Sequence, residues 1–191
     1  MTRGRLEAFS DGVIAIIITI MVLELKVPRG SDLEAIRPLL PAFASYVMSF
    51  IMLGIYWNNH HHLMHAIKHV DGRVLWANLH LLFWLSLMPV VTAWAGETHF
   101  AAWPVAAWGA VQFMSGTAYF ILVRALLVLH GSDSVLAAAI GRDFKGIVSV
   151  VLYLVAVVLA FVHPAIACGL YIFVAAMWLI PDRRITRTLT R

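Results

Sequence analysis

Charged residues are what this chain lacks most. Asp, Glu, Lys and Arg make up only 13% of its 191 residues, and 62% of the residues are hydrophobic. An ordinary soluble domain is about 25% charged. A soluble fold of this size has no means of burying so much apolar surface, so the composition predicts an integral membrane protein.

Cysteine is nearly absent as well. The single Cys168 lies inside an apolar run, so an internal disulfide is excluded. The cysteine content therefore does not tell an oxidising compartment from a reducing one. The signatures of common enzymes are also missing, because the chain has no P-loop, no GxSxG and no aspartate pair suited to intramembrane proteolysis. We therefore expect no enzymatic activity, no cofactor and no bound metal.

The chain is basic, with a formal net charge of +4. A positive net charge is compatible with nucleic-acid binding. The basic residues, however, gather in the expected loops and the tail, as membrane topology requires. We therefore expect no nucleic-acid partner. Only Lys26, Arg29 and Arg37 lie at one end of the expected bundle. The other end carries the larger group: Arg3, Arg5, Lys68, Arg73, Arg142, Lys145, Arg183, Arg184, Arg187 and Arg191, with Arg124 towards it.

The end with more cations is expected to face the cytoplasm, which places both termini there. The lack of a disulfide and of a soluble domain outside the membrane is compatible with a bacterial inner membrane. We expect a multi-pass protein of the cell membrane.

Stretches free of charged residues mark the expected helices. They cover residues 38–67, 74–96, 98–123 and 146–181. The last is 36 residues long, too long for one crossing of about 30 Å, and Pro164 divides it. With a first helix before them, the sequence predicts one all-α membrane domain over 1–191 with six transmembrane helices: about 5–26, 40–63, 73–95, 101–130, 143–163 and 164–181.

The first expected helix is unusual because charged residues bracket it. Only twelve residues separate Asp11 from Glu24, whereas a helix that faces lipid on all sides needs about 20 apolar residues. Ionisable groups in a membrane usually face a bundle interior or water. One face of this helix has the spacing i, i+3, i+4 and i+7: Ile16, Thr19, Ile20 and Leu23.

Two interpretations of this face are open from the residues alone. It is an ordinary packing stripe, or it is a hydrophobic constriction with one hydroxyl layer that lines a pore. Since one chain supplies only one such helix, the pore interpretation also predicts a symmetric homo-oligomer.

Asp11 needs a partner if it lies near the membrane. Arg5 is six residues away and points to another side of the same helix. Partners on other helices are therefore expected, either the histidines of the second helix or Asn78 and His80 of the third. The alternative is a helix-capping or water-exposed carboxylate.

Histidines crowd the end of the second expected helix. His61, His65 and His69 share a face if the helix runs that far, and imidazole is a ligand for zinc, copper or nickel. No carboxylate or cysteine lies between Pro38 and His69 to complete such a site. We therefore favour a wet helix end with hydrogen bonds between helices over a metal site, and pH sensing is a further possibility.

The stretch Arg5-x-x-x-Phe9-Ser10-Asp11 resembles the signature that opens the transmembrane protein 175 family, the lysosomal potassium channels and their bacterial relatives. Further landmarks are similar to its prokaryotic branch: Tyr56-Trp57-x-x-His60-His61, Leu75-Trp76-x-Asn78-Leu79 and Pro89. The resemblance covers essentially the whole chain.

This resemblance implies a passive, potassium-permeable channel, built as a homotetramer with four first helices around the pore. It places the pore isoleucine on Ile16 and the threonine layer on Thr19, with further constrictions at Ile20 and Leu23. The signature residues are implied to hold the first helix rather than to bind ions. We expect them to do so in a polar network with the next two helices: Arg5, Phe9, Ser10, Asp11, His60, His61, Asn78 and His80.

Two functions of other classes are alternatives. A proton-coupled secondary transporter would use Asp11 and the helix-two histidines as a proton relay, although the repeated halves and broken helices typical of transporters are not visible. A non-conducting scaffold or metal-responsive sensor would use the histidines instead.

Overall fold

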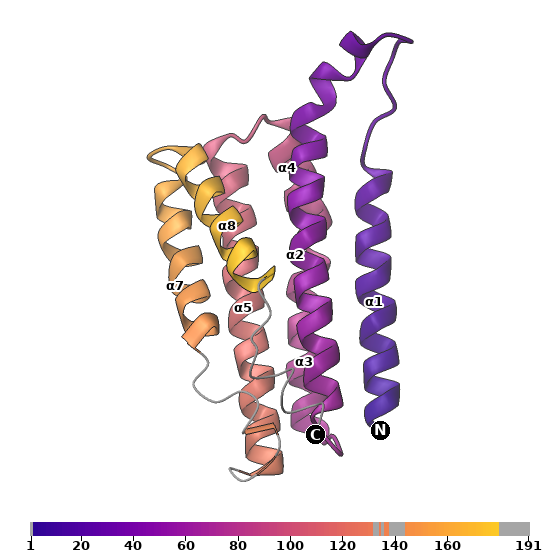
Figure 1. Cartoon of the computed structure of the whole chain (residues 1–191), viewed down its shortest axis with the longest axis vertical. Helices are drawn as coiled ribbons and strands as arrows, with labels where there is room; N and C mark the ends of the chain where they lie inside the picture. Colours follow the sequence, from indigo (N-terminus) through magenta and orange to yellow (C-terminus); the bar gives the residue numbers. More distant parts are fainter. Residues whose placement is uncertain (1, 132–133, 135, 138–143, 180–191) are drawn as a thin grey trace.

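The computed structural model describes residues 2–131, 134, 136–137 and 144–179. These residues form a bundle of helices that stand side by side, with no strand among them (Figure 1). The helices are α1 (Arg3–Leu23), α2 (Leu40–His65), α3 (Gly72–Ser86), α4 (Met88–Glu97), α5 (Ala102–His130), α7 (Phe144–Leu159) and α8 (Pro164–Leu179). Two short 3₁₀ turns, η1 (Leu33–Ala35) and η2 (Arg37–Leu39), lead into α2.

Four segments are long and apolar enough to cross a membrane: α1, residues 33–65, residues 72–97 and α5. The last two helices, α7 and α8, are apolar but have only 16 residues each, which is about 24 Å of helix. If α3 and α4 are counted as one interrupted span, the described residues hold six apolar helical segments. The all-α, multi-pass membrane fold expected from the sequence is confirmed.

The third expected helix, 73–95, is in fact two helices that meet at Leu87. Its beginning is well defined, because the Asp71 carboxylate accepts a hydrogen bond from the Val74 amide at 2.9 Å. The interruption follows from Pro89, which stands at the start of α4. Proline has no N–H to donate and its ring clashes with the carbonyl four residues earlier, so a continuous helix is broken there.

Other helix ends differ from the expected ones by a few residues. The first helix ends at Leu23 rather than at 26. The segment expected at 143–163 ends at Leu159, and turns over 160–162 lead to Pro164. The expected limits at 143 and 181 lie outside the described residues, as do Arg142 and the cations of the tail.

α1 stands at one edge of the bundle. It packs against α2, α3 and α4, while α7 and α8 lie at the opposite edge, with α5 between the two groups (Figure 1). α5 and α8 approach closely at Gly109, where any Cβ would collide with the Tyr171 hydroxyl. The outer side of α1 therefore has no cover from the other helices that the structure describes.

The two ends of the bundle differ in charge and in contacts. The start of α1 and the end of α2 lie at the same end (Figure 1), and Arg3 donates to the Ile67 carbonyl there at 3.2 Å. At the far end, Lys26 pairs with Glu97 at 2.6 Å, with both side chains more than half exposed. Exposed ion pairs add little stability, so this pair contributes little to the position of α1.

Candidate functional site

α1 has one buried face and one exposed face. The buried face alternates by three and four residues, as a packed helix side should: Leu6, Ser10, Ile14, Ile17 and Met21. The exposed face carries the four residues singled out in the sequence, which we call the outer stripe: Ile16, Thr19, Ile20 and Leu23. Three of them are large apolar side chains, and their exposed fractions are 59% for Ile16, 41% for Ile20 and 80% for Leu23.

Thr19 is the polar member of the outer stripe. Its hydroxyl donates to the Ile16 carbonyl one turn earlier at 2.9 Å. The hydroxyl proton is thus used inside the helix, and the oxygen keeps its lone pairs for whatever faces the stripe. The exposed surface of the outer stripe is therefore apolar, apart from one hydroxyl oxygen that can accept a hydrogen bond.

A buried chain of hydrogen bonds joins the inner face of α1 to α2 and α3. The Ser10 hydroxyl donates to the Leu6 carbonyl at 2.9 Å and accepts from the Asn78 amide at 2.9 Å. The Asn78 side-chain oxygen lies 2.8 Å from Nε2 of His60. Because that oxygen only accepts, His60 carries its proton on Nε2, and its Nδ1 has no partner among the described residues.

Asp11 lies just outside this buried chain. Its carboxylate accepts a hydrogen bond from the indole N–H of Trp57 at 3.0 Å. The partner lies on another helix, as expected, but it is the indole of Trp57 on α2 rather than a histidine of α2, Asn78 or His80. A neutral donor stabilises a carboxylate at the end of a span without adding a second charge.

Three residues expected in the polar network lie elsewhere. Arg5 is exposed, and Phe9 is 49% exposed on the outward side of α1. His80 accepts a hydrogen bond from the indole of Trp84, four residues on in its own helix, at 2.9 Å. The structure therefore joins Ser10, Asn78 and His60 directly. Arg5, Phe9 and His80 lie outside this chain of hydrogen bonds.

Glu7 makes polar contacts with two histidines that the sequence did not reveal. One of its carboxylate oxygens, Oε1, lies 3.2 Å from Nδ1 of His61 and 3.5 Å from Nε2 of His65. The available signal was that Glu7 is three residues before Ser10, close to the same face. His69 does not join this group, because α2 ends at His65, and its ring lies 4.6 Å from that of His130.

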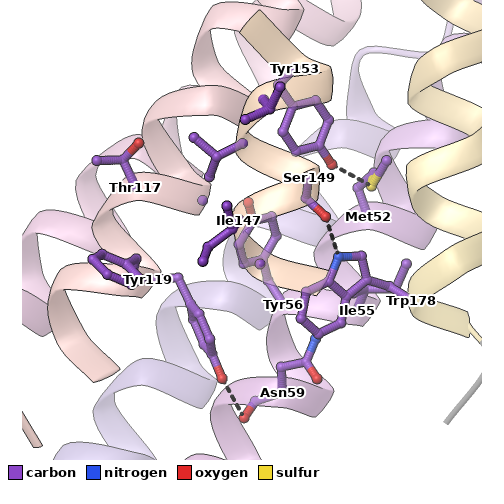
Figure 2. A pocket seen from close by; sticks show the side chains of 15 residues that line it. Met52, Ile55, Tyr56, Asn59, Thr117, Tyr119, Ile147, Ser149, Tyr153 and Trp178 are labelled. Atoms are coloured by element: carbon purple, nitrogen blue, oxygen red, sulfur yellow. Dashed lines mark hydrogen bonds between the residues drawn. The ribbon is translucent and has the colours of Figure 1, made fainter. Parts of the chain in front are cut away.

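An apolar pocket of about 240 Å³ lies among α2, α5, α7 and α8 (Figure 2). Its lining residues include no charged side chain. Figure 2 shows its polar groups turned to one another, with the Trp178 indole donating to Ser149 at 2.8 Å and the Tyr153 hydroxyl 3.7 Å from the Met52 sulfur. We assign no ion chemistry to this pocket, and none of the predicted site residues lines it.

Replacing Asn78 by Leu should destabilise the protein, because it leaves the Ser10 hydroxyl and His60 without their partner in a buried place. Unsatisfied buried groups cost about 1–3 kcal/mol each. Thermal unfolding of the purified chain in detergent, followed by circular dichroism, measures the effect.

The matched control for this substitution is Gln112→Met on α5. Gln112 is also fully buried, but neither atom of its amide has a partner among the described residues. Its loss should leave the melting temperature unchanged or raise it. Equal destabilisation by the two variants would show that the Asn78 bonds contribute nothing specific.

Three comparisons with known proteins point to one family. Residues 5–89 match the family model described as the endosomal/lysosomal potassium channel TMEM175. A protein of Chryseobacterium sp. named as a potassium channel is 56% identical over 189 residues, which cover 99% of this chain and 98% of that protein. The human protein named endosomal/lysosomal proton channel TMEM175 is 34% identical over 96 residues, which cover 44% of this chain and 19% of its own length.

A solved structure is similar over nearly the whole fold. It is the crystal structure of a lysosomal potassium-selective channel TMEM175 homolog from Chamaesiphon minutus, with a TM-score of 0.78 and 26% identity. The match covers 93% of this chain and 96% of that one. The signature on α1, the full-length relative and the shared fold lead to one conclusion: this chain belongs to the TMEM175 family.

Proposed function

We propose that this chain is one subunit of a potassium-permeable channel that carries passive cation flux across a membrane. The observation that carries the proposal is the outer stripe, an apolar row with one hydroxyl layer on an edge helix, which the rest of residues 2–131 and 144–179 leaves uncovered. The potassium-channel names of the Chryseobacterium and Chamaesiphon proteins support potassium as the permeant ion. Other monovalent cations are proposed to pass less readily.

The proposed assembly is a homotetramer with four copies of α1 around a central axis. A single edge helix cannot enclose a pore, and closed rotational symmetry is the usual way in which identical chains surround one. The number four is what the resemblance to the family implies. In this assembly the bilayer covers the outer helices, the termini are cytoplasmic, and the membrane is a bacterial inner membrane.

The proposed path is an apolar neck formed by Ile16, Ile20 and Leu23 of the four subunits. Successive side chains of this row are three or four residues apart, which is about 4.5–6 Å along the axis. Such a neck excludes bulk water and makes a cation shed part of its hydration shell. Potassium sheds water at less cost than sodium, and the Thr19 oxygens replace part of what is lost. A weak preference for potassium follows without a carbonyl-lined filter.

Proton-coupled transport is the alternative function. The name proton channel, carried by the human relative, favours proton movement in this family. In this chain, however, Asp11 faces an indole N–H and His60 faces Asn78, so the hydrogen bonds among the described residues do not link these two titratable groups in a row. A potassium flux that requires an opposing pH gradient would favour the transporter over the channel.

Replacing Ile16 by Ala should widen the neck, raising potassium flux and lowering the preference over sodium. The measurement is flux from liposomes loaded with potassium, compared with liposomes loaded with sodium. The matched control is Ile172→Ala, since Ile172 on α8 is equally exposed, at 59%, but lies at the opposite edge of the bundle. Flux and selectivity equal to those of the unmodified chain would remove Ile16 from the pore.

Replacing Thr19 by Val keeps the side-chain shape and removes the oxygen. The potassium-to-sodium flux ratio should fall towards one while total flux persists, because the neck keeps its width and loses its acceptors. Thr117→Val is the control, since that hydroxyl on α5 also donates to its own helix, at 2.9 Å from the Phe113 carbonyl. An unchanged ratio in Thr19→Val would contradict a threonine layer.

The assembly itself is testable with introduced cysteines, because Cys168 is the only native one. In a Cys168→Ala background, Leu23→Cys should give covalent dimers with a short bismaleimide, because each chain offers one thiol and so joins one neighbour across the shared axis. Val158→Cys, 62% exposed on α7, should stay monomeric on denaturing gels. Equal crosslinking of both variants, or none in either, would argue against α1 at a shared axis.

A further inference from the structure

Glu7, His61 and His65 form a compact cluster where the first turns of α1 meet the last turns of α2. Their ligand atoms all lie within 4.8 Å of one another. The two histidines are four residues apart on α2, so their rings project from one face, with centroids 4.4 Å apart. Both rings direct a nitrogen atom towards the same carboxylate oxygen of Glu7.

The two distances from the Glu7 carboxylate to the histidine nitrogens match those in a zinc coordination shell, and all three ligand atoms lie within 4.8 Å of one another. Ligand atoms about 2.0–2.1 Å from a tetrahedral zinc ion are about 3.3 Å apart. The carboxylate oxygen of Glu7 lies 3.2 Å from the His61 nitrogen and 3.5 Å from the His65 nitrogen. Two imidazoles and one carboxylate are an established zinc donor set, with the remaining position left to water.

The cluster is also reachable from water. The side chains of His61 and His65 are 40% and 48% exposed, whereas that of Glu7 is 16% exposed. An ion can therefore approach from the histidine side and meet a carboxylate that is already held in place. The Trp57 ring, which bonds Asp11, stacks on the His61 ring at 6.0 Å between centroids and restricts its orientation.

We propose that Glu7, His61 and His65 bind a divalent transition-metal ion, with zinc as the best fit, and that the ion ties the start of α1 to the end of α2. Imidazole with carboxylate suits zinc over magnesium or calcium, which prefer sets made only of oxygen ligands. The carboxylate that was missing from the histidine row of α2 is supplied by a different helix. This site does not depend on the channel function proposed above.

The test is zinc binding by the full chain in detergent or nanodiscs, purified without a polyhistidine tag. Isothermal titration calorimetry should give about one zinc ion per chain, and zinc should raise the melting temperature because it binds the folded state. Glu7→Gln, His61→Gln and His65→Gln should each weaken binding at least about tenfold. His62→Gln on the same helix is the control and should leave the affinity unchanged.

Two readouts keep the test valid if a variant folds poorly. Size-exclusion profiles and melting temperatures without metal identify variants that fail to fold, and these are left out of the comparison. In the unmodified chain, cobalt should give the intense visible absorption bands of a four-coordinate ion, and zinc should displace them. Weak, octahedral-type cobalt bands, or zinc affinity that survives in folded Glu7→Gln and His65→Gln chains, would overturn the proposal.

Discussion

The rotation of α1 about its own axis depends on one buried chain of hydrogen bonds, from the Leu6 carbonyl through Ser10 and Asn78 to His60. In a bilayer, lipid is as apolar as the side chains, so hydrophobic burial does not decide which side of an apolar helix turns inward. Both faces of α1 are rich in isoleucine. The few polar groups that must find partners away from water therefore decide which face of α1 packs against the bundle.

Once Ser10 faces Asn78, the rest of α1 follows from helical geometry. Residues spaced by three and four from Ser10 turn into the bundle, and the outer stripe turns away from it. The same end of the helix also carries the contacts of Asp11 with Trp57, of Glu7 with His61 and His65, and of Arg3 with the Ile67 carbonyl. Polar anchoring of α1 is thus concentrated in its N-terminal half, and the other half contributes the apolar row.

Much of the fold was predictable because it depends on local properties of the chain. Charge-free stretches marked the spans, and Pro164 divided the last of them where α8 begins. The break between α3 and α4 at Pro89 lies inside a charge-free stretch, so the pattern of charges marks the span and not the interruption. The polar network was less predictable. Ser10, His60 and Asn78 come together, whereas Arg5, Phe9 and His80 do not, since sharing a motif does not place residues on the same side of a helix.

The sequence by itself determined that this is an all-α membrane protein with an unusual, charge-bracketed first helix, because composition and helical spacing need no knowledge of neighbours. Only the tertiary structure decided that Trp57 is the partner of Asp11 and that Glu7 completes a cluster with two histidines of α2. These pairs are 46 or more residues apart in the chain. Their meeting depends on how each helix is rotated against the next, and that rotation is set by a few buried polar contacts that no single helix encodes alone.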